Sequence, residues 1–420
     1  MITHFQPPSK SLTPRDYQFI ALVVIVFLAI CAALIYANLT LKGGGEFYVH
    51  WVGARAFLFD KIDPYSGEVA ARVQGLVYEG SAQVGDEPYI LDTPFQILLL
   101  YFPFSIFSNA TVVRAVFTLL LELALFALAV LSLRLTDWES PRFFAILFVF
   151  LAAFNFYAFQ AVFESSPILI LAFFYAAILT AYRAEADEFV GALLSFSLYY
   201  WEVGAPFLIL FFWRAYREKR TRIFAGFFMF ALVMYFVAFL SYPDWVIPFL
   251  RATVNNLRAD FGFSAHAVLI DLLPAQGKSL GWILTIGLVI ALGYEWSLAV
   301  SGDFRRFYWA SCLSLAAAPL LGFRTEMEHL IVLVIPLALV FAVVHDRWRR
   351  IGNSLTFLLM LVIFAVPWLL YFLPLTRSYK FASELTFLFL PLSTLIGLYW
   401  IRWWAIRPPR ILSDLSTHNP

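Results

Sequence analysis

Charged residues are scarce in this chain of 420 residues, where Asp, Glu, Lys and Arg together make up 14%. A typical soluble domain has about 25% charged and about 45–50% apolar residues, whereas 62% of this chain is hydrophobic. A water-soluble fold is excluded, because too few polar side chains are present to cover its surface. The formal net charge of +1 also gives no indication of a nucleic-acid partner.

Cysteine is almost absent, and the two that occur, Cys31 and Cys312, each lie inside an apolar run. Such cysteines usually behave as small buried hydrophobic residues, so no disulfide framework is expected. The sequence has no Gly-x-x-x-x-Gly-Lys-Ser/Thr phosphate loop and no His-Glu-x-x-His zinc pair. No Asp-x-Asp pair occurs between residues 40 and 92. We therefore expect neither a metal ion nor another cofactor.

Long apolar runs dominate the sequence instead. A membrane-spanning helix needs about 20 mostly apolar residues. The runs that approach this length cover residues 17–39, 94–107, 110–133, 143–159, 165–182, 189–213, 223–241, 280–300, 307–322, 330–344, 355–374 and 385–404. The first is too long for a signal-peptide core and lacks a small-residue cleavage site, so we expect it to be retained. The sequence predicts an all-α polytopic membrane protein of about twelve transmembrane helices.

Basic residues indicate the orientation of these helices. They concentrate in the connecting segments 214–222, 305–306, 347–350 and 402–410, and short basic loops favour the cytoplasm. With an even number of spans, both termini of a multi-pass plasma (inner) membrane protein are cytoplasmic. The polar segments 40–92 and 242–279 then lie outside. Residues 346–420 are expected to add further transmembrane helices and a cytoplasmic tail.

The first outer loop carries helical periodicity in two places. The apolar residues that repeat at helical spacing are Phe47, Trp51, Ala54, Phe57 and Leu58, and then Val69, Val73, Leu76 and Val77. This pattern predicts two amphipathic helices lying on the membrane surface.

A series of short motifs resembles one family of membrane enzymes. In chain order they are Glu46-Phe47-Tyr48, Trp51 with Ala54 and Ala56, Asp63-Pro64-Tyr65, Phe159-Gln160 followed by 165–171, the apolar helix and basic turn of 191–222, and the segments 266–273 and 319–329. Their order and spacing resemble the membrane glycosyltransferases of the GT-C superfamily. The nearest branch is family 87, the bacterial polyprenyl-phosphate-mannose-dependent enzymes.

The resemblance implies a GT-C-like catalytic module over residues 1–345, including both outer loops. It further implies an inverting transfer of a sugar, mannose first, from a polyprenyl-phosphate donor to a glycolipid or glycan acceptor of the cell envelope. The active site would lie on the extracytoplasmic face. The chain departs from the family pattern at Glu46, Phe159 and Glu202, where the family has Asp, Gly and Lys, and has only His329 in place of a His pair.

Glu46 is the expected catalytic base, because a carboxylate at the membrane boundary is partly desolvated and its pKa rises toward the working range. Cations would hold the donor phosphate. The candidates are Arg324, His329, Arg258 and His266. The candidates for the substrate pocket are Tyr48, His50, Asp63, Tyr65, Gln160 and Glu202.

Several of these residues also have a structural interpretation. Asp63 precedes a proline and is typical of a turn, and each basic candidate could contact lipid headgroups. Glu202 could pair with Arg183 or be protonated. Glu164 lies four residues after Gln160 on one helical face, and twelve spans would place both near the cytoplasm unless the helices there are short and re-entrant.

Two other functions stay open. A lipid or solute transporter should concentrate polar groups on broken helices near the middle of the membrane. Here the polar residues gather in two outer loops, which favours the enzyme. An inactive relative that acts in envelope polymer assembly is also compatible with the substituted positions.

Overall fold

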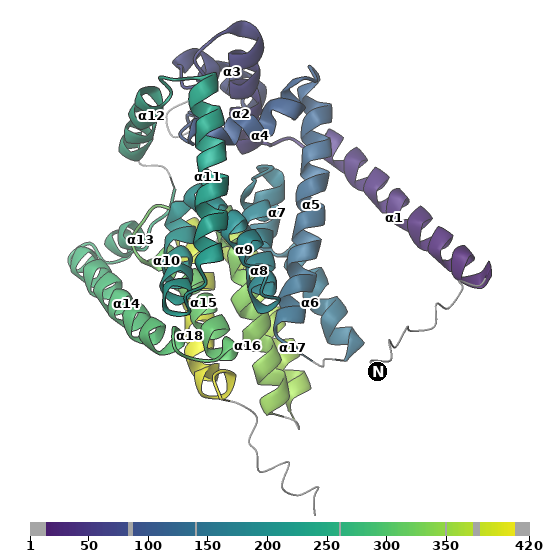
Figure 1. Cartoon of the computed structure of the whole chain (residues 1–420), viewed down its shortest axis with the longest axis vertical. Coiled ribbons are helices and arrows are strands. Elements are labelled where there is room, and N and C mark those ends of the chain that lie inside the picture. The colour runs from purple at the N-terminus through teal and green to yellow at the C-terminus, as the bar shows by residue number, and fades with distance from the viewer. Residues whose placement is uncertain are drawn as a thin grey trace, which may run out of the picture.

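The structure, a computed structural model, describes residues 14–82, 87–138, 141–259, 262–348, 351–372 and 379–407. Within these ranges every regular element is helical (Figure 1). An isolated antiparallel bridge joins Phe263 to Thr325. The predicted all-α fold class is therefore confirmed.

Among the described residues, six helical segments are long and apolar enough to cross a membrane. They are Ala110–Leu135, Thr221–Ser241, Gly277–Ala299, Met327–Arg347, Gly352–Phe372 and Phe381–Ala405. The number rises to eight if each of two bent helix pairs forms one span. The predicted count of about twelve is not confirmed. The runs 94–107 and 165–182 form the shorter helices α4 (Phe95–Ser105) and α8 (Ile168–Arg183), because a helix enclosed by protein need not match the bilayer thickness.

The N-terminal part of the chain contains both helices expected in the first loop. Its elements are α1 (Pro14–Thr40), α2 (Gly45–Arg55), the short π-helix η1 (Ala56–Asp60) and α3 (Gly67–Val77). The axis of α2 turns by 83° from that of α1. Nearly every residue of α2 is buried, so α2 packs inside the protein and does not lie exposed on a surface. Only α3 has the expected amphipathic character, with Val69, Ala70 and Val73 buried.

The middle of the chain forms a bundle with two short, interrupted helices. Its elements are α5 (Ala110–Leu135), α6 (Arg142–Phe154), α7 (Phe156–Phe163), α8, α9 (Asp187–Leu194), the 3₁₀-helix η2 (Ser195–Leu198), α10 (Trp201–Arg217) and α11 (Thr221–Ser241). Asn155 separates α6 from α7, since its side chain caps α7 by accepting a hydrogen bond from the Ala158 N–H at 2.9 Å. The two helices meet at an angle of 47°.

The C-terminal part encloses one helix in the centre of the bundle. Its elements are α12 (Val246–Ala259), α13 (Ala265–Leu272), α14 (Gly277–Ala299), α15 (Phe304–Ala317), the 3₁₀-helices η3 (Ala318–Leu320) and η4 (Met327–Leu333), α16 (Val334–Arg347), α17 (Gly352–Phe372) and α18 (Tyr379–Ala405). In the most apolar stretch of η4 and α16, 94% of the residues are buried. Arg402 of α18 forms a bidentate ion pair with Glu295 of α14, at 2.8 and 2.9 Å. Glu295 therefore has a structural partner.

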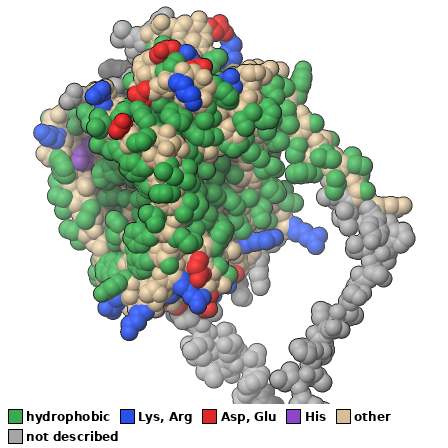
Figure 2. Space-filling model, turned by 45° about the horizontal axis from the view of Figure 1, so that its top comes forward, with side chains coloured by type: hydrophobic (Ala, Val, Ile, Leu, Met, Phe, Trp, Pro, Cys, Tyr) green, Lys and Arg blue, Asp and Glu red, His purple; other side chains and the backbone are tan. Residues whose placement is uncertain are grey.

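The two ends of the bundle differ. Helices α2, α3, α4 and α12 gather at one end, and the N-terminal end of α1 and the C-terminal end of α18 point the opposite way (Figure 1). On the face drawn in Figure 2, hydrophobic side chains form a broad belt, and charged side chains gather mainly toward its two ends. This distribution fits a lipid bilayer around the belt.

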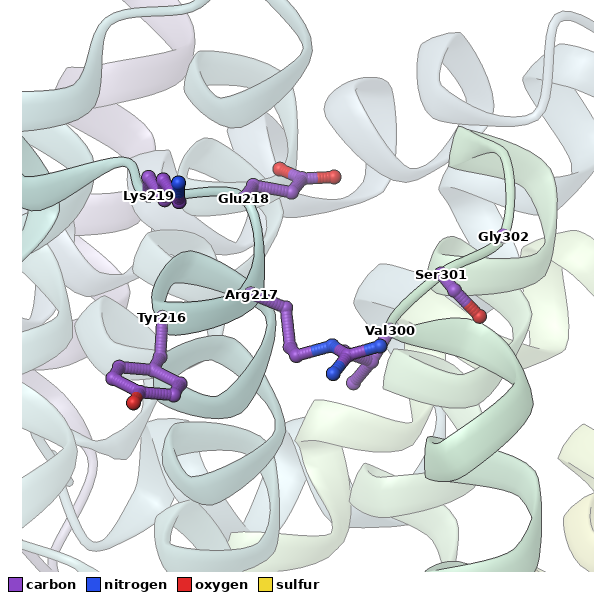
Figure 3. A pocket seen from close by; sticks show the side chains of 7 residues that line it. All are labelled: Tyr216, Arg217, Glu218, Lys219, Val300, Ser301 and Gly302. Carbon is purple, nitrogen blue, oxygen red and sulfur yellow. The ribbon is translucent and has the colours of Figure 1, made fainter.

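The basic turn that follows α10 closes one side of an open cavity of about 520 Å³ (Figure 3). Residues 300–302 form the opposite side. The buried Arg214 pairs with Glu218 at 2.6 Å and donates to the carbonyl oxygens of Ala299 and Gly302 at 2.7 and 3.0 Å. Arg214 thus ties the end of α10 to the segment between α14 and α15.

Candidate functional site

Glu46 is the second residue of α2 and follows the glycine turn that ends α1. Gly43 and Gly44 have φ angles of 111° and 90°, a backbone conformation that favours glycine. The Tyr200 hydroxyl donates a hydrogen bond to Glu46 Oε1. Glu46 Oε2 is buried and has no hydrogen-bond partner among the described residues. The hydrogen bond from Tyr200 therefore orients the carboxylate through Oε1, and Oε2 can accept a proton or contact a ligand.

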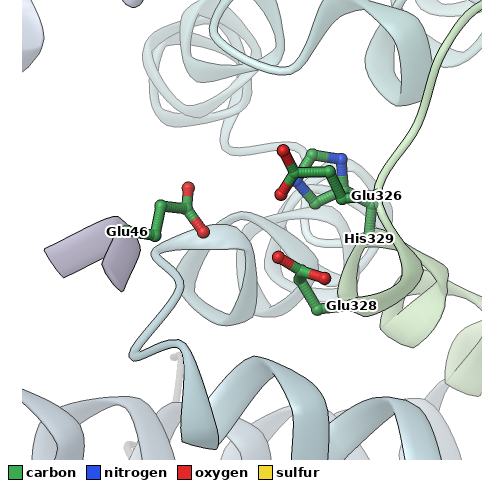
Figure 4. Close-up of side chains that lie close together, drawn as sticks. All are labelled: Glu46, Glu326, Glu328 and His329. Carbon is green, nitrogen blue, oxygen red and sulfur yellow. The ribbon is translucent and has the colours of Figure 1, made fainter. Parts of the chain in front are cut away.

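Three more ionisable side chains lie close to Glu46, and they come from the first residues of η4 and the residue that precedes it. The carboxylates of Glu326 and Glu328 and the ring of His329 point toward the space in front of Glu46 (Figure 4). One ligand-type atom from each of the four residues lies within 4.8 Å of the others. We call Glu46, Glu326, Glu328 and His329 the carboxylate–histidine cluster.

His329 is the only basic residue of this cluster, and 5% of its surface is exposed. Its Nδ1 lies 3.2 Å from Glu202 Oε1, and its ring packs edge to face on Tyr200 with centroids 4.7 Å apart. Its Nε2 is buried without a hydrogen-bond partner in the described part of the chain. Glu202 therefore pairs with His329, while Arg183, its expected partner, forms an ion pair with Asp137 at 2.9 Å.

The end of α7 borders the cluster on a third side. Glu164 Oε2 accepts a hydrogen bond from the Gly45 N–H at 3.1 Å, and the Gly44 N–H donates to the Phe163 carbonyl at 2.8 Å. Burial, assisted by the charge of Glu326, raises the pKa of Glu164 to about 7 from its ordinary value of 4.5. The Gly45 N–H and the charge of Arg114 oppose this rise. Gln160 and Glu164 are therefore on the same side as Glu46, because α6 and α7 are short and bent.

Arg114 fixes the turn that carries Glu46. Its guanidinium donates to the carbonyl oxygens of Gly43 at 2.6 Å and Asn38 at 2.7 Å, and also to that of Leu41. The side chain is buried, with 4% of its surface exposed. These three hydrogen bonds hold the turn, while Arg114 Nε is buried without a partner among the described residues.

Comparison with known proteins finds no relative. No family model, curated protein or solved structure matches this chain. Any function must therefore be inferred from the chemistry of the site, together with the motif resemblance described above.

The remaining pocket candidates from the first loop make internal contacts. His50 Nδ1 lies 2.8 Å from the Glu46 carbonyl oxygen, and its Nε2 lies 3.1 Å from Thr93 Oγ1. Asp63 accepts from the Tyr65 N–H at 3.0 Å, which is the turn contact expected of Asp before Pro. The Tyr65 hydroxyl donates to the Thr93 carbonyl at 3.0 Å. These contacts give the three side chains structural roles, and Tyr48 is buried with Arg114 over its ring at 6.0 Å.

The other phosphate candidates are not among the four residues of the carboxylate–histidine cluster. Arg324 is partly exposed and lies two residues before Glu326. His266 packs in the α13–α14 corner, with Nε2 2.8 Å from Thr285 Oγ1 and its ring against Trp282. The side chain of Arg258 lies outside the described residues.

Sequence reasoning missed Glu326, Glu328 and Tyr200 as site residues. The signal for the first two was present, because Glu-Met-Glu-His directly precedes the apolar run 330–344. Ionisable residues at the start of a fully enclosed helix are costly unless they have partners or a function. Tyr200 carried no comparable signal.

We expect Glu164→Gln to stabilise the protein at pH 8 and to leave its stability nearly unchanged at pH 5. The raised pKa means that ionisation disfavours the folded state, so wild-type stability is lost as pH rises from 4.5 to about 7. Gln stays neutral and can still accept from the Gly45 N–H. The gain should be about 1–2 kcal/mol, below the limit of about 3 kcal/mol set by the pKa shift, since Glu164 is partly exposed.

Thermal unfolding in detergent at the two pH values measures this difference. The exposed Glu79→Gln is the matched control, because it removes a surface carboxylate paired only with Lys42. An equal gain at both pH values would show that charge at Glu164 is not the cause.

Proposed function

We propose that the chain is an inverting membrane glycosyltransferase that moves a sugar from polyprenyl phosphate to an envelope glycolipid or glycan. The observation that carries this proposal is the oriented carboxylate of Glu46, which follows α1 directly and faces a buried His–Glu pair. The motif resemblance supplies the donor class and makes mannose the first sugar to test. The catalytic face would be extracytoplasmic, on the side opposite the basic turn after α10.

The chemistry assigns one role to each group near Glu46. Its unpartnered Oε2 would take the proton of the acceptor hydroxyl, as a general base does. The acceptor oxygen then forms a bond to the anomeric carbon while the bond from that carbon to the phosphate oxygen breaks. Polyprenyl phosphate leaves with the electron pair. Tyr200 would orient Glu46 through Oε1, and Glu202 would hold His329 in place.

The alternative function is a lipid or solute transporter, and the bent helices favour it. The bent pair α1–α2 turns just before Glu46, and α7 of the bent pair α6–α7 ends against the same turn, where the Gly44 N–H donates to the Phe163 carbonyl. Transporters often bind their substrates at broken helices. The enzyme is the better proposal because the ionisable groups form one compact cluster beside an oriented carboxylate. A transport path would need polar groups on both sides of a central site.

The test is a donor panel. Purified protein in lipid nanodiscs is incubated with polyprenyl-phosphate mannose, glucose, galactose or arabinose, each with an envelope glycolipid extract, and released polyprenyl phosphate is measured by mass spectrometry. We expect release from one donor at least a hundredfold above heat-treated protein, the scale of a positioned general base. Release from no donor, by protein that keeps its unfolding transition, would contradict the proposal.

A further inference from the structure

The carboxylate–histidine cluster concentrates negative charge in a buried place. Three carboxylates surround the ring of His329, and Glu164 and Glu202 lie nearby. Arg114, which lies beside the turn that carries Glu46, donates its hydrogen bonds to three backbone carbonyls. Carboxylates gathered out of water repel one another, so such a group needs either protons or a cation.

A second observation indicates a cation rather than protons alone. The His329 side chain is more than nine-tenths buried, and neither of its ring nitrogens has a hydrogen-bond partner in the described part of the chain. Nδ1 lies 3.2 Å from the Glu202 carboxylate. A carboxylate on one ring nitrogen commonly orients a histidine whose other nitrogen binds a metal. In this arrangement Glu202 would orient the His329 ring from Nδ1, and Nε2 would be the nitrogen that binds the ion.

The spacing of the cluster fits one ion. Ligand atoms on opposite sides of a bound divalent cation lie about 4–5 Å apart, twice a bond length of about 2.0–2.5 Å. The four ligand-type atoms of the cluster lie within 4.8 Å of one another. Mixed carboxylate and imidazole ligands suit first-row divalent ions such as Mn²⁺, whereas Mg²⁺ and Ca²⁺ prefer oxygen alone.

We propose that the carboxylate–histidine cluster binds one divalent cation of the Mn²⁺ type. The ligands come from two segments about 280 residues apart in sequence, at the start of α2 and the start of η4. A sequence search for a local Asp-x-Asp pair could not detect such a site. This proposal replaces the sequence-based expectation of no metal.

The cation would have a specific use if the proposed function is correct, and this step depends on that function. A donor phosphate that approaches Glu46 meets several carboxylates and only one imidazole of the cluster. A bound divalent ion would reverse this local charge and would contact the phosphate oxygens. A carboxylate has about four lone-pair positions, so Glu46 can contact Tyr200 and the ion and still accept a proton.

The experiment measures binding of Mn²⁺ without any donor. Detergent-purified protein is treated with EDTA, exchanged into metal-free buffer and titrated with MnCl₂, and free Mn²⁺ is followed by its six-line electron paramagnetic resonance signal. We expect one Mn²⁺ per chain. Glu328→Gln should weaken binding at least tenfold, on the scale seen when an ordered ligand shell is disturbed. The exposed Glu79→Gln should bind as the wild type does.

Glu202→Gln is a second variant that leaves all four ligands in place. It should weaken Mn²⁺ binding by about tenfold through His329 alone. Less than 0.2 Mn²⁺ bound per chain, as an order of magnitude for residual contamination, or unchanged affinity in Glu328→Gln, would overturn the cation site. If the protein binds Mn²⁺ but turns over no donor, the cation site is supported and the proposed function is contradicted. If the protein turns over a donor after EDTA treatment and binds no Mn²⁺, the proposed function is supported and the cation site is contradicted.

Discussion

We expect Arg114→Met to lower the free energy of unfolding by about 3–5 kcal/mol, the range for breaking a buried charged network. The reason is the three carbonyl groups that receive hydrogen bonds from the guanidinium, at Asn38, Leu41 and Gly43. A buried carbonyl left without a donor costs about 1–3 kcal/mol, and this applies in full to Asn38 and in part to Leu41 and Gly43, whose hydrogen bonds are partly buried. Met keeps most of the volume and removes the donors together with the charge. Thermal or denaturant unfolding in detergent gives the difference directly.

Two further variants test whether the lost hydrogen bonds cause this destabilisation. Arg134 lies on the same helix, α5, and is exposed, so Arg134→Met should change stability by less than about 0.5 kcal/mol. Arg114→Lys keeps the charge but lacks the planar fork, and should recover only part of the loss. If Arg114→Lys were as stable as the wild type, charge rather than the fork would be what the turn requires.

The fold was predictable from the sequence at the level of its class. Apolar runs of about 20 residues predict membrane helices because the bilayer sets their length. The number of spans was not predictable in the same way. The run 189–213 contains α9, η2 and α10, and this division depends on packing with partners distant in sequence.

One close helix contact illustrates this limit. A Cβ on Gly191 of α9 would overlap the Ile223 carbonyl of α11, so the two helices can approach only because glycine is present. In the sequence alone, Gly191 is an ordinary glycine inside an apolar run. The shape of the bundle at this point follows from a contact that hydrophobic periodicity does not reveal.

The site was only partly predictable. Glu46 stood out because it follows the first apolar run and three glycines, and the turn it follows does use Gly43 and Gly44 at positive φ. The prediction of full-length spans places Glu164 near the cytoplasmic end of its helix, away from Glu46. The Asn155 cap that shortens α7 reverses this placement. Residues brought together by short, bent helices are therefore the ones that sequence analysis assigns least well.

If the proposed function is correct, we expect Glu46→Gln to lower turnover of the donor identified by the panel by about two to four orders of magnitude, the effect of losing a general base. Gln keeps the shape of Glu and can still accept the Tyr200 hydrogen bond through its carbonyl oxygen. It cannot take a proton from the acceptor. Steady-state rates of polyprenyl phosphate release measure the loss, and at saturating Mn²⁺ the donor KM should change little.

Three comparisons distinguish a base from a cation ligand at Glu46. Asp63→Asn is the first, because Asp63 caps a turn in the same loop; its activity should stay within about threefold of the wild type, a change of less than about 0.7 kcal/mol. Glu46→Asp should keep part of the activity, since the carboxylate retreats by one methylene and a shift near 1 Å can cost about a hundredfold. The third adds excess Mn²⁺ to Glu46→Gln. A base cannot be replaced by an ion, so turnover should stay low even when Mn²⁺ occupancy is restored; recovery of turnover would assign Glu46 to cation binding and place the base elsewhere in the site.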